Sequence, residues 1–241
     1  DQLLKADFDG AIQTLKEQLK LAKTVDDPAQ LARSQEELAS AMGKLELYPQ
    51  ALERYTESYQ LFLSLGNTFH AAFCLLNRAD MLARLGSYDE ASGALDELTP
   101  LLNALPADNN YKSIWTAFSY LIRAQMDLSE GRLPEARANC VEALAKIAGK
   151  DRKALGNTEA AIKQTLGLVE VYSGATGKGI KLCREALTLL DNSEDHEYGD
   201  SYASLAEALL ESGDARNSEI YALKAQESFA ARHRLPSEWR A

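Results

Sequence analysis

Cysteine is scarce in this sequence, with three residues in 241, at Cys74, Cys140 and Cys183. An odd number of widely spaced cysteines supplies neither a disulfide framework nor the close pairs that bind zinc. We therefore expect a reducing, cytoplasmic environment and no metal site. Cys140 and Cys183 occupy the same position in two helical patterns, and we expect both to be small core side chains.

Basic residues are also in deficit, because 26 Lys and Arg stand against 36 Asp and Glu and leave a formal net charge of −10. Such a chain repels a polyphosphate backbone, so nucleic acid is not the expected partner. No apolar run approaches the roughly 18 to 20 residues that span a bilayer. The N-terminus lacks a basic region followed by an apolar stretch, so we expect neither a membrane segment nor export.

Residues arranged for catalysis are missing as well. His70, His196 and His233 lie far apart with no second ligand at helical spacing, and we expect surface or helix-capping roles for them. Neighbouring carboxylates such as Asp89 and Glu90 point about 100° apart on a helix, so they do not converge on one substrate. The glycine-rich stretch 173–179 lacks the spacing of a phosphate loop and is predicted to be a turn. We therefore predict no enzyme, no catalytic residue and no cofactor.

What the sequence does contain is a recurring turn between two apolar helical patterns. The clearest copy is Leu85-Gly86-Ser87-Tyr88-Asp89-Glu90-Ala91, and the small residue that ends it recurs along the chain. The equivalent positions are Ala11, Ala51, Ala91, Ala136, Gly179 and Ser218, at spacings of 40, 40, 45, 43 and 39 residues. A period in this range is typical of a solenoid built from stacked helical hairpins.

Apolar residues at three-and-four spacing predict the helices of that array. The predicted helices span 9–23, 28–44, 49–65, 111–130, 134–148, 158–173, 176–190, 196–212 and 215–232, with a helical hairpin over 68–103. Pro100 lies inside the second helix of this hairpin, and we expect the helix to end early or kink there. The expected organisation is one array over residues 1–241. Its complete hairpins are 25–66, 67–110, 111–155, 156–195 and 196–234, preceded by a partial unit at 1–24 and followed by the start of another at 235–241.

The residues at fixed offsets resemble the tetratricopeptide repeat (TPR). The third unit has Leu75, Ala79, Leu82, Gly86, Tyr88 and Ala91, and the sixth has Tyr202, Leu205, Ala206, Leu209, Gly213 and Ser218. Units of about 40 residues resemble the longer variety found in kinesin light chains and in bacterial regulatory and signalling proteins. The resemblance implies an all-α, right-handed superhelical solenoid of antiparallel hairpins whose first helices line a concave groove.

The family register also implies which side chains line that groove. The candidates for partner binding are Asn77, Asp80, Arg84, Leu121, Gln125, Gln164, Leu168 and Tyr172. Asn77 stands where chaperone-binding members carry an asparagine that grips a C-terminal carboxylate. Glu36 and Ser40 occupy positions where that clamp needs other residues, and Glu36 would repel a carboxylate, so we do not expect chaperone-tail binding.

The resemblance implies a protein–protein interaction scaffold that binds a peptide or a partner protein in its concave groove. An alternative from a different class is a ligand- or partner-responsive sensor module. It would control a neighbouring kinase, protease or DNA-binding domain in a longer bacterial signalling protein. Neither end of the sequence reads as a polar capping unit, so we expect a fragment of a larger protein.

Overall fold

The computed structural model describes residues 8–24, 27–151, 155, 157–190 and 198–231, and their regular structure is helical. The helices are α1 (Phe8–Thr24), α2 (Pro28–Lys44), α3 (Tyr48–Ser64), α4 (Thr68–Arg84), α5 (Tyr88–Ala104), α6 (Asn110–Ser129), α7 (Leu133–Ile147), α9 (Thr158–Tyr172), α10 (Thr176–Leu190), α11 (Tyr198–Glu211) and α12 (Ala215–Ala231). Their bounds match the predicted helices closely, except that His196 lies outside the described residues. The fold class is all-α.

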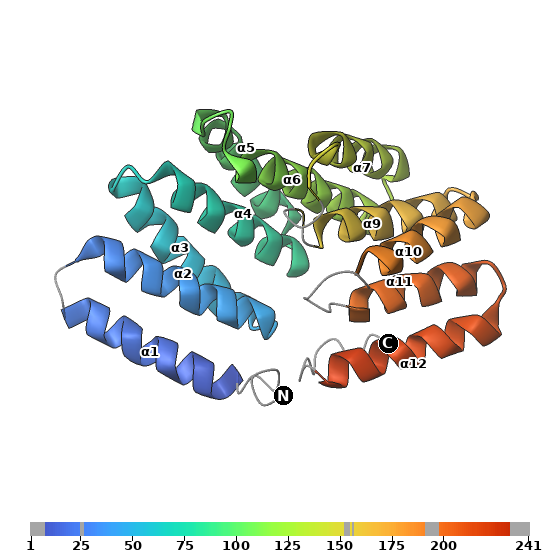
Figure 1. Cartoon of the computed structure of the whole chain (residues 1–241), viewed down its shortest axis with the longest axis horizontal. Helices are drawn as coiled ribbons and strands as arrows, with labels where there is room; N and C mark the ends of the chain where they lie inside the picture. Colours follow the sequence, from blue (N-terminus) through green and yellow to red (C-terminus); the bar gives the residue numbers. More distant parts are fainter. Residues whose placement is uncertain (1–7, 25–26, 152–154, 156, 191–197, 232–241) are drawn as a thin grey trace. The chain divides into compact units, whose positions relative to one another are not determined.

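The chain divides into two compact units, Asp1–Lys112 and Ser113–Ala241. In the first unit, each helix from α1 to α5 packs against the next one along the chain, as can be followed in Figure 1. In the second unit, α9, α10, α11 and α12 pack in the same sequential way, and α9 also contacts α11. Helices that are joined by short loops and pack mainly against the next helix along the chain are typical of a helical repeat array. A single array over the whole chain remains a prediction of the sequence.

The hairpin turns depend on glycines in the left-handed region of backbone space. Gly86 has φ 78°, and the turns at Gly131, Gly174 and Gly213 repeat this conformation. After Gly86, the amide of Ser87 donates to the carbonyl of Leu82 over 2.9 Å, which satisfies a carbonyl left open at the end of α4. The turn predicted at 85–91 is thereby confirmed, and so is the turn at 173–179.

Glu46 takes this glycine position in the turn between α2 and α3, with φ 57°. The bond that closes the turn is kept, since the amide of Leu47 donates to the carbonyl of Met42 over 3.0 Å. A side chain with a Cβ is disfavoured in this conformation. We expect Glu46→Gly to be more stable than Glu46→Ala by about 1 kcal/mol, because both variants lose the same side chain and only glycine relieves the strain. Urea unfolding of the two variants measures this difference, and equal stabilities would contradict it.

Small side chains occupy the places where helices approach closely. Ala51, Ala91 and Ala136 are each 0% exposed. Gly179 and Ser218 are buried too, and the Ser218 hydroxyl donates to the carbonyl of Ala206 over 2.8 Å. The predicted equivalence of these five positions is confirmed. The side chain of Ala11 lies outside the description.

Each of the two units is stabilised by its own clusters of buried side chains. In the first unit Phe62, Tyr55 and Leu38 belong to one cluster, with α2, α3 and α4 contributing most of it. The second unit has a cluster built by α6, α7 and α9 and another built by α9, α10 and α11. Cys140 and Cys183 lie in these clusters at 0% exposure, which confirms their predicted role as core side chains. Burial raises the pKa of each thiol to about 12, so neither is a thiolate at neutral pH.

Pro100 does not end its helix early, which was one of the two outcomes expected from the sequence. Helix α5 continues through it to Ala104. Pro100 cannot donate to the carbonyl of Asp96, but both residues are exposed, so water can reach that carbonyl. The neighbouring carbonyl of Leu95 also accepts from the hydroxyl of Thr99 over 3.1 Å. The exposure of this side of α5 to water makes the proline tolerable there.

Candidate functional site

In the first unit, the predicted binding residues of α4 are engaged in local contacts. The side-chain amide of Asn77 donates to the carbonyl of Phe73 over 2.8 Å. Asp80 is buried and accepts from Nε of Arg84 over 3.0 Å. The Arg84 guanidinium also lies 5.8 Å from the ring centroid of Tyr48. These groups stabilise the end of α4 and its contact with α3.

Leu121 is not available to a ligand, and its prediction as a groove residue needs correction. It is 1% exposed and belongs to the cluster that includes Cys140 and Ile162. The side chain therefore faces α7 and α9 and helps to hold the second unit together. Gln125, one turn further along α6, is half-buried.

The three remaining candidates form one stripe on α9. Gln164, Leu168 and Tyr172 are four residues apart, a spacing that places them on one side of the helix. Two of them reach α11: the amide of Gln164 donates to the hydroxyl of Ser201, and the hydroxyl of Tyr172 donates to the carboxylate of Glu207. Leu168 lies between them and is half-buried, and Tyr172 is 44% exposed. The structure thus brings these three together beside α11.

The adjacent surface of α11 is acidic. Its side chains at three-and-four spacing are Asp200, Ser204, Glu207 and Glu211. We call the surface made by these four residues with Gln164, Leu168 and Tyr172 the α9–α11 face. Helix α11 contains no Lys or Arg.

The environment of Tyr172, including its acidic neighbours, changes the pKa of its hydroxyl. The pKa of Tyr172 is raised, first by the partial burial of its hydroxyl and then by Glu207 and Glu211. The phenol is therefore protonated at neutral pH and acts as a donor, which leaves the other oxygen of Glu207 as an acceptor. Chemically, the face offers an aliphatic and aromatic patch bordered by carboxylates.

Close packing beneath the face fixes the position of α9. A Cβ on Gly167 would lie 2.6 Å from Sγ of Cys183 and 3.0 Å from the carbonyl oxygen of Gly179. The backbones of α9 and α10 therefore approach closely at Gly167 and Gly179. On its other side, α9 carries Glu170, whose carboxylate is held by Arg137 of α7 and Lys178 of α10.

His70, for which the sequence predicts a surface or helix-capping role, also makes contacts between helices. Its ring is half-buried and stacks on Phe62 with centroids 4.7 Å apart. Its Nδ1 lies 2.8 Å from Oε2 of Glu36. The sequence did not reveal this pair, because the two residues belong to different helices and 34 positions separate them.

Among the residues that the structure describes, no group of three or more His, Cys, Asp or Glu side chains could hold a metal ion. None of the helices in this part of the chain combines the length and apolarity needed to span a bilayer.

No protein-family model matches the sequence, and a search of curated proteins gave no match either. Solved structures do resemble the fold. NprR in complex with its cognate peptide NprX is similar with a TM-score of 0.73 at 15% identity, covering 96% of this chain and 66% of that chain. Rap protein complexed with Competence and Sporulation Factor is similar with a TM-score of 0.68 at 15% identity, covering 96% and 67%.

A third similar structure is named for its repeats. It is PH0952 from Pyrococcus horikoshii, a signal transduction ATPase with numerous domains that has a tetratricopeptide repeat sensor. The TM-score is 0.55 at 15% identity, over 99% of this chain and 42% of that chain. The fold is that of tetratricopeptide repeat proteins. Helices α9 and α10, and α11 and α12, each form a pair joined by a short turn, and α9 also contacts α11.

Proposed function

We propose that this chain is a protein-interaction scaffold and that it binds an extended or helical peptide segment on the α9–α11 face. The observation that carries the proposal is the stripe of Gln164, Leu168 and Tyr172, which is hydrogen-bonded to α11 and lies beside the carboxylates of Glu207 and Glu211. The similar NprR and Rap structures each hold a peptide or a factor, which supports a peptide ligand for this fold. The proposed role needs no catalytic group.

The chemistry of the face defines the class of segment that fits it. Leu168 and the ring of Tyr172 offer apolar area, and the amide of Gln164 can hydrogen-bond to a peptide backbone. The carboxylates of α11 attract cations and repel anions, including nucleic acid phosphates. The expected partner is therefore a segment with an apolar centre and basic flanks.

Two synthetic peptides test this assignment. They share an apolar centre, and one is flanked by lysines and the other by glutamates. We expect the lysine-flanked peptide to bind at least about tenfold more tightly in 50 mM salt, and we expect this preference to shrink in 500 mM salt because screening weakens exposed charge pairs. Isothermal titration calorimetry at the two salt concentrations measures both effects.

Matched double variants locate the effect on the protein. Glu207→Gln with Glu211→Gln should weaken the lysine-flanked peptide about tenfold, since two exposed ion pairs contribute up to about 1 kcal/mol each. Glu219→Gln with Glu227→Gln removes the same charge from exposed positions of α12 and should change affinity less than about twofold. Equal effects of the two double variants, or equal affinity for both peptides, would overturn the proposal.

The sensor alternative has support of its own in one comparison. In PH0952, a tetratricopeptide repeat sensor forms part of a signal transduction ATPase, and this chain covers 42% of that protein. We propose as the second candidate that peptide binding here controls a neighbouring domain of a longer protein. The test is whether the lysine-flanked peptide changes the activity of the full-length protein. If the peptide binds and the activity of the full-length protein does not change, the sensor function is excluded and the scaffold function stands.

A further inference from the structure

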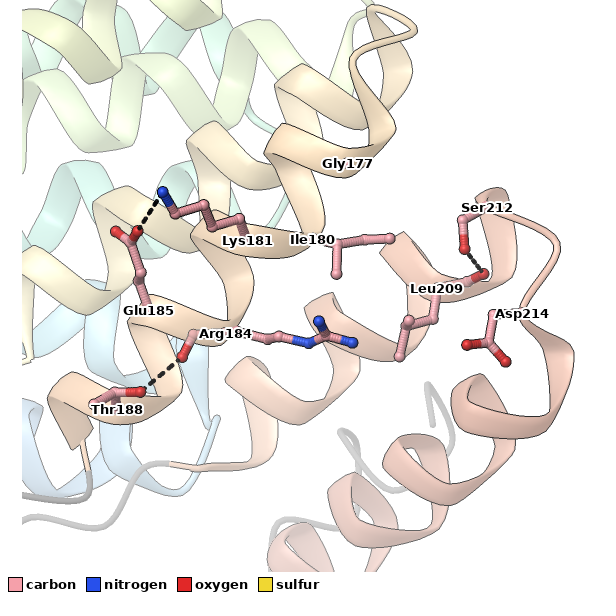
Figure 2. A pocket seen from close by; sticks show the side chains of 9 residues that line it. All are labelled: Gly177, Ile180, Lys181, Arg184, Glu185, Thr188, Leu209, Ser212 and Asp214. Atoms are coloured by element: carbon pink, nitrogen blue, oxygen red, sulfur yellow. Dashed lines mark hydrogen bonds and ion pairs between the residues drawn. The ribbon is translucent and has the colours of Figure 1, made fainter.

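A hollow of about 460 Å³ lies in the second unit, where α10 faces the turn between α11 and α12. Figure 2 shows it opening between these elements. Its lining residues are Gly177, Ile180, Lys181, Arg184, Glu185, Thr188, Leu209, Ser212 and Asp214. These residues belong to α10, the end of α11 and the α11–α12 turn, and none of them is part of the α9–α11 face.

Arg184 is the charged group that points into this hollow. Figure 2 shows its guanidinium extending from α10 towards Leu209 and Asp214. Arg184 is exposed, and no ion pair to it occurs among the side chains that the structure describes. A guanidinium offers five donors in a planar fork that matches a carboxylate. Its donors are thus available to an incoming anion.

The other charged groups of the hollow are already engaged. Lys181 is directed towards Glu185, and Glu185 also receives Nζ of Lys163 over 2.9 Å. Asp214 accepts from the backbone amide of Asn217 over 3.2 Å and from its side-chain amide over 2.6 Å, as the cap of α12. Among the described side chains Arg184 makes no contact ion pair, although its positive charge acts on Asp214 and, after the hydrogen bonds from Asn217, helps to lower the pKa of that carboxyl.

Apolar side chains flank the guanidinium. Leu209 is 2% exposed and forms part of the floor, and the half-buried Ile180 stands beside it. Gly177 leaves the rim without a side chain, and a Cβ there would meet nothing within 4 Å. The hydroxyl of Ser212 donates to the carbonyl of Leu209 and so adds no free donor.

We propose that this hollow binds an aliphatic carboxylate, with the carboxylate on Arg184 and the aliphatic group against Ile180 and Leu209. Asp214 faces the same space, so the anion lies on the α10 side of the guanidinium and binding is of modest strength. Two sources carry this chemistry: the C-terminus of a peptide that ends in an aliphatic residue, and a free branched-chain acid. The hollow has room for either group.

The test uses small probes and the whole chain. N-acetyl-leucine presents the carboxylate with its aliphatic side chain, and N-acetyl-leucinamide is its neutral match. In ¹H–¹⁵N correlation spectra, N-acetyl-leucine should shift the amides of Ile180, Arg184, Leu209 and Ser212, and the amide probe should bind at least about tenfold more weakly. An acetylated peptide ending in leucine and free 4-methylpentanoic acid separate the two sources by their relative affinities.

Two arginine variants provide the control. Arg184→Met should weaken N-acetyl-leucine binding about tenfold or more, because it keeps the apolar stem and removes the fork. Arg33→Met removes the same charge from an exposed position on α2 in the first unit, and affinity should stay within about twofold. The proposal is overturned if N-acetyl-leucine causes no shift at 20 mM, if the amide binds equally well, or if both variants behave alike.

Discussion

Replacing Gly179 with alanine should lower the free energy of unfolding by about 3 kcal/mol, the upper part of the range for overpacked sites. A Cβ at this position would overlap the carbonyl oxygen of Gly167 and a methyl group of Val171, and it would lie 3.0 Å from the amide nitrogen of Val171. Two of these three neighbours are backbone atoms, so the strain cannot be relieved by turning a side chain. The helices α9 and α10 would have to separate. Urea unfolding followed by circular dichroism measures the loss.

Gly177 supplies the control on the same helix. It is exposed, and a Cβ there would meet nothing within 4 Å. Gly177→Ala should leave the stability unchanged or raise it by up to about 1 kcal/mol, because alanine is the better helix former. If the two alanine variants unfold at the same urea concentration, the close approach of α9 and α10 is wrong.

Replacing Arg137 with methionine should cost about 2 to 3 kcal/mol at pH 7, since it leaves a buried carboxylate with only the contact from Lys178. The Glu170 side chain is 3% exposed, and Arg137 contacts both of its oxygens, at 2.9 and 3.0 Å. Lys178 provides the other contact, at 3.0 Å, from a side chain that is 62% exposed. Lys178→Met should therefore cost less, about 1 kcal/mol.

The stability lost in Arg137→Met should depend on pH. Burial acts to raise the pKa of Glu170, but the hydrogen bonds and charges of Arg137 and Lys178 outweigh it and hold the pKa below its ordinary value of 4.5. A depressed folded-state pKa stabilises the protein above the unfolded value, and this stabilisation is lost as the pH falls through the folded pKa. In Arg137→Met the carboxylate is less well supported and protonates more readily. The stability difference from wild type should therefore be smaller at pH 4 than at pH 7, and a difference that grows on acidification would contradict the ion cluster.

The fold could be predicted from the sequence because its determinants are local and repeated. The position of Gly86 follows from the need for a left-handed residue at a helix end, and the burial of Ala91 and Ala136 follows from their shared place in the period. Glu46 also adopts the left-handed backbone conformation of this turn position, although it is not a glycine. Repetition corrects the errors that a single unit would introduce.

The candidate site was less predictable, because it depends on the rotation of each helix about its axis. A rotation of about 100°, the angle between adjacent residues, moves a side chain such as Leu121 from a groove into the core. Contacts between helices were also hidden: Arg137 and Glu170 are 33 positions apart, and nothing in their local sequence pairs them. Gln164, Leu168 and Tyr172 were predicted from the family register, and their spacing of four keeps them on one side of α9 whatever the rotation of the helix.

The most direct test of the central claim is the place where a basic peptide is captured. A lysine-flanked peptide with a benzophenone side chain at its apolar centre can be photo-crosslinked to the protein, and the attachment sites can be read by mass spectrometry. We predict attachment within residues 164–172 and 204–211, the stretches that carry the α9–α11 face. Attachment confined to residues 8–112, or to the exposed side chains of α10 and α12, would contradict the account.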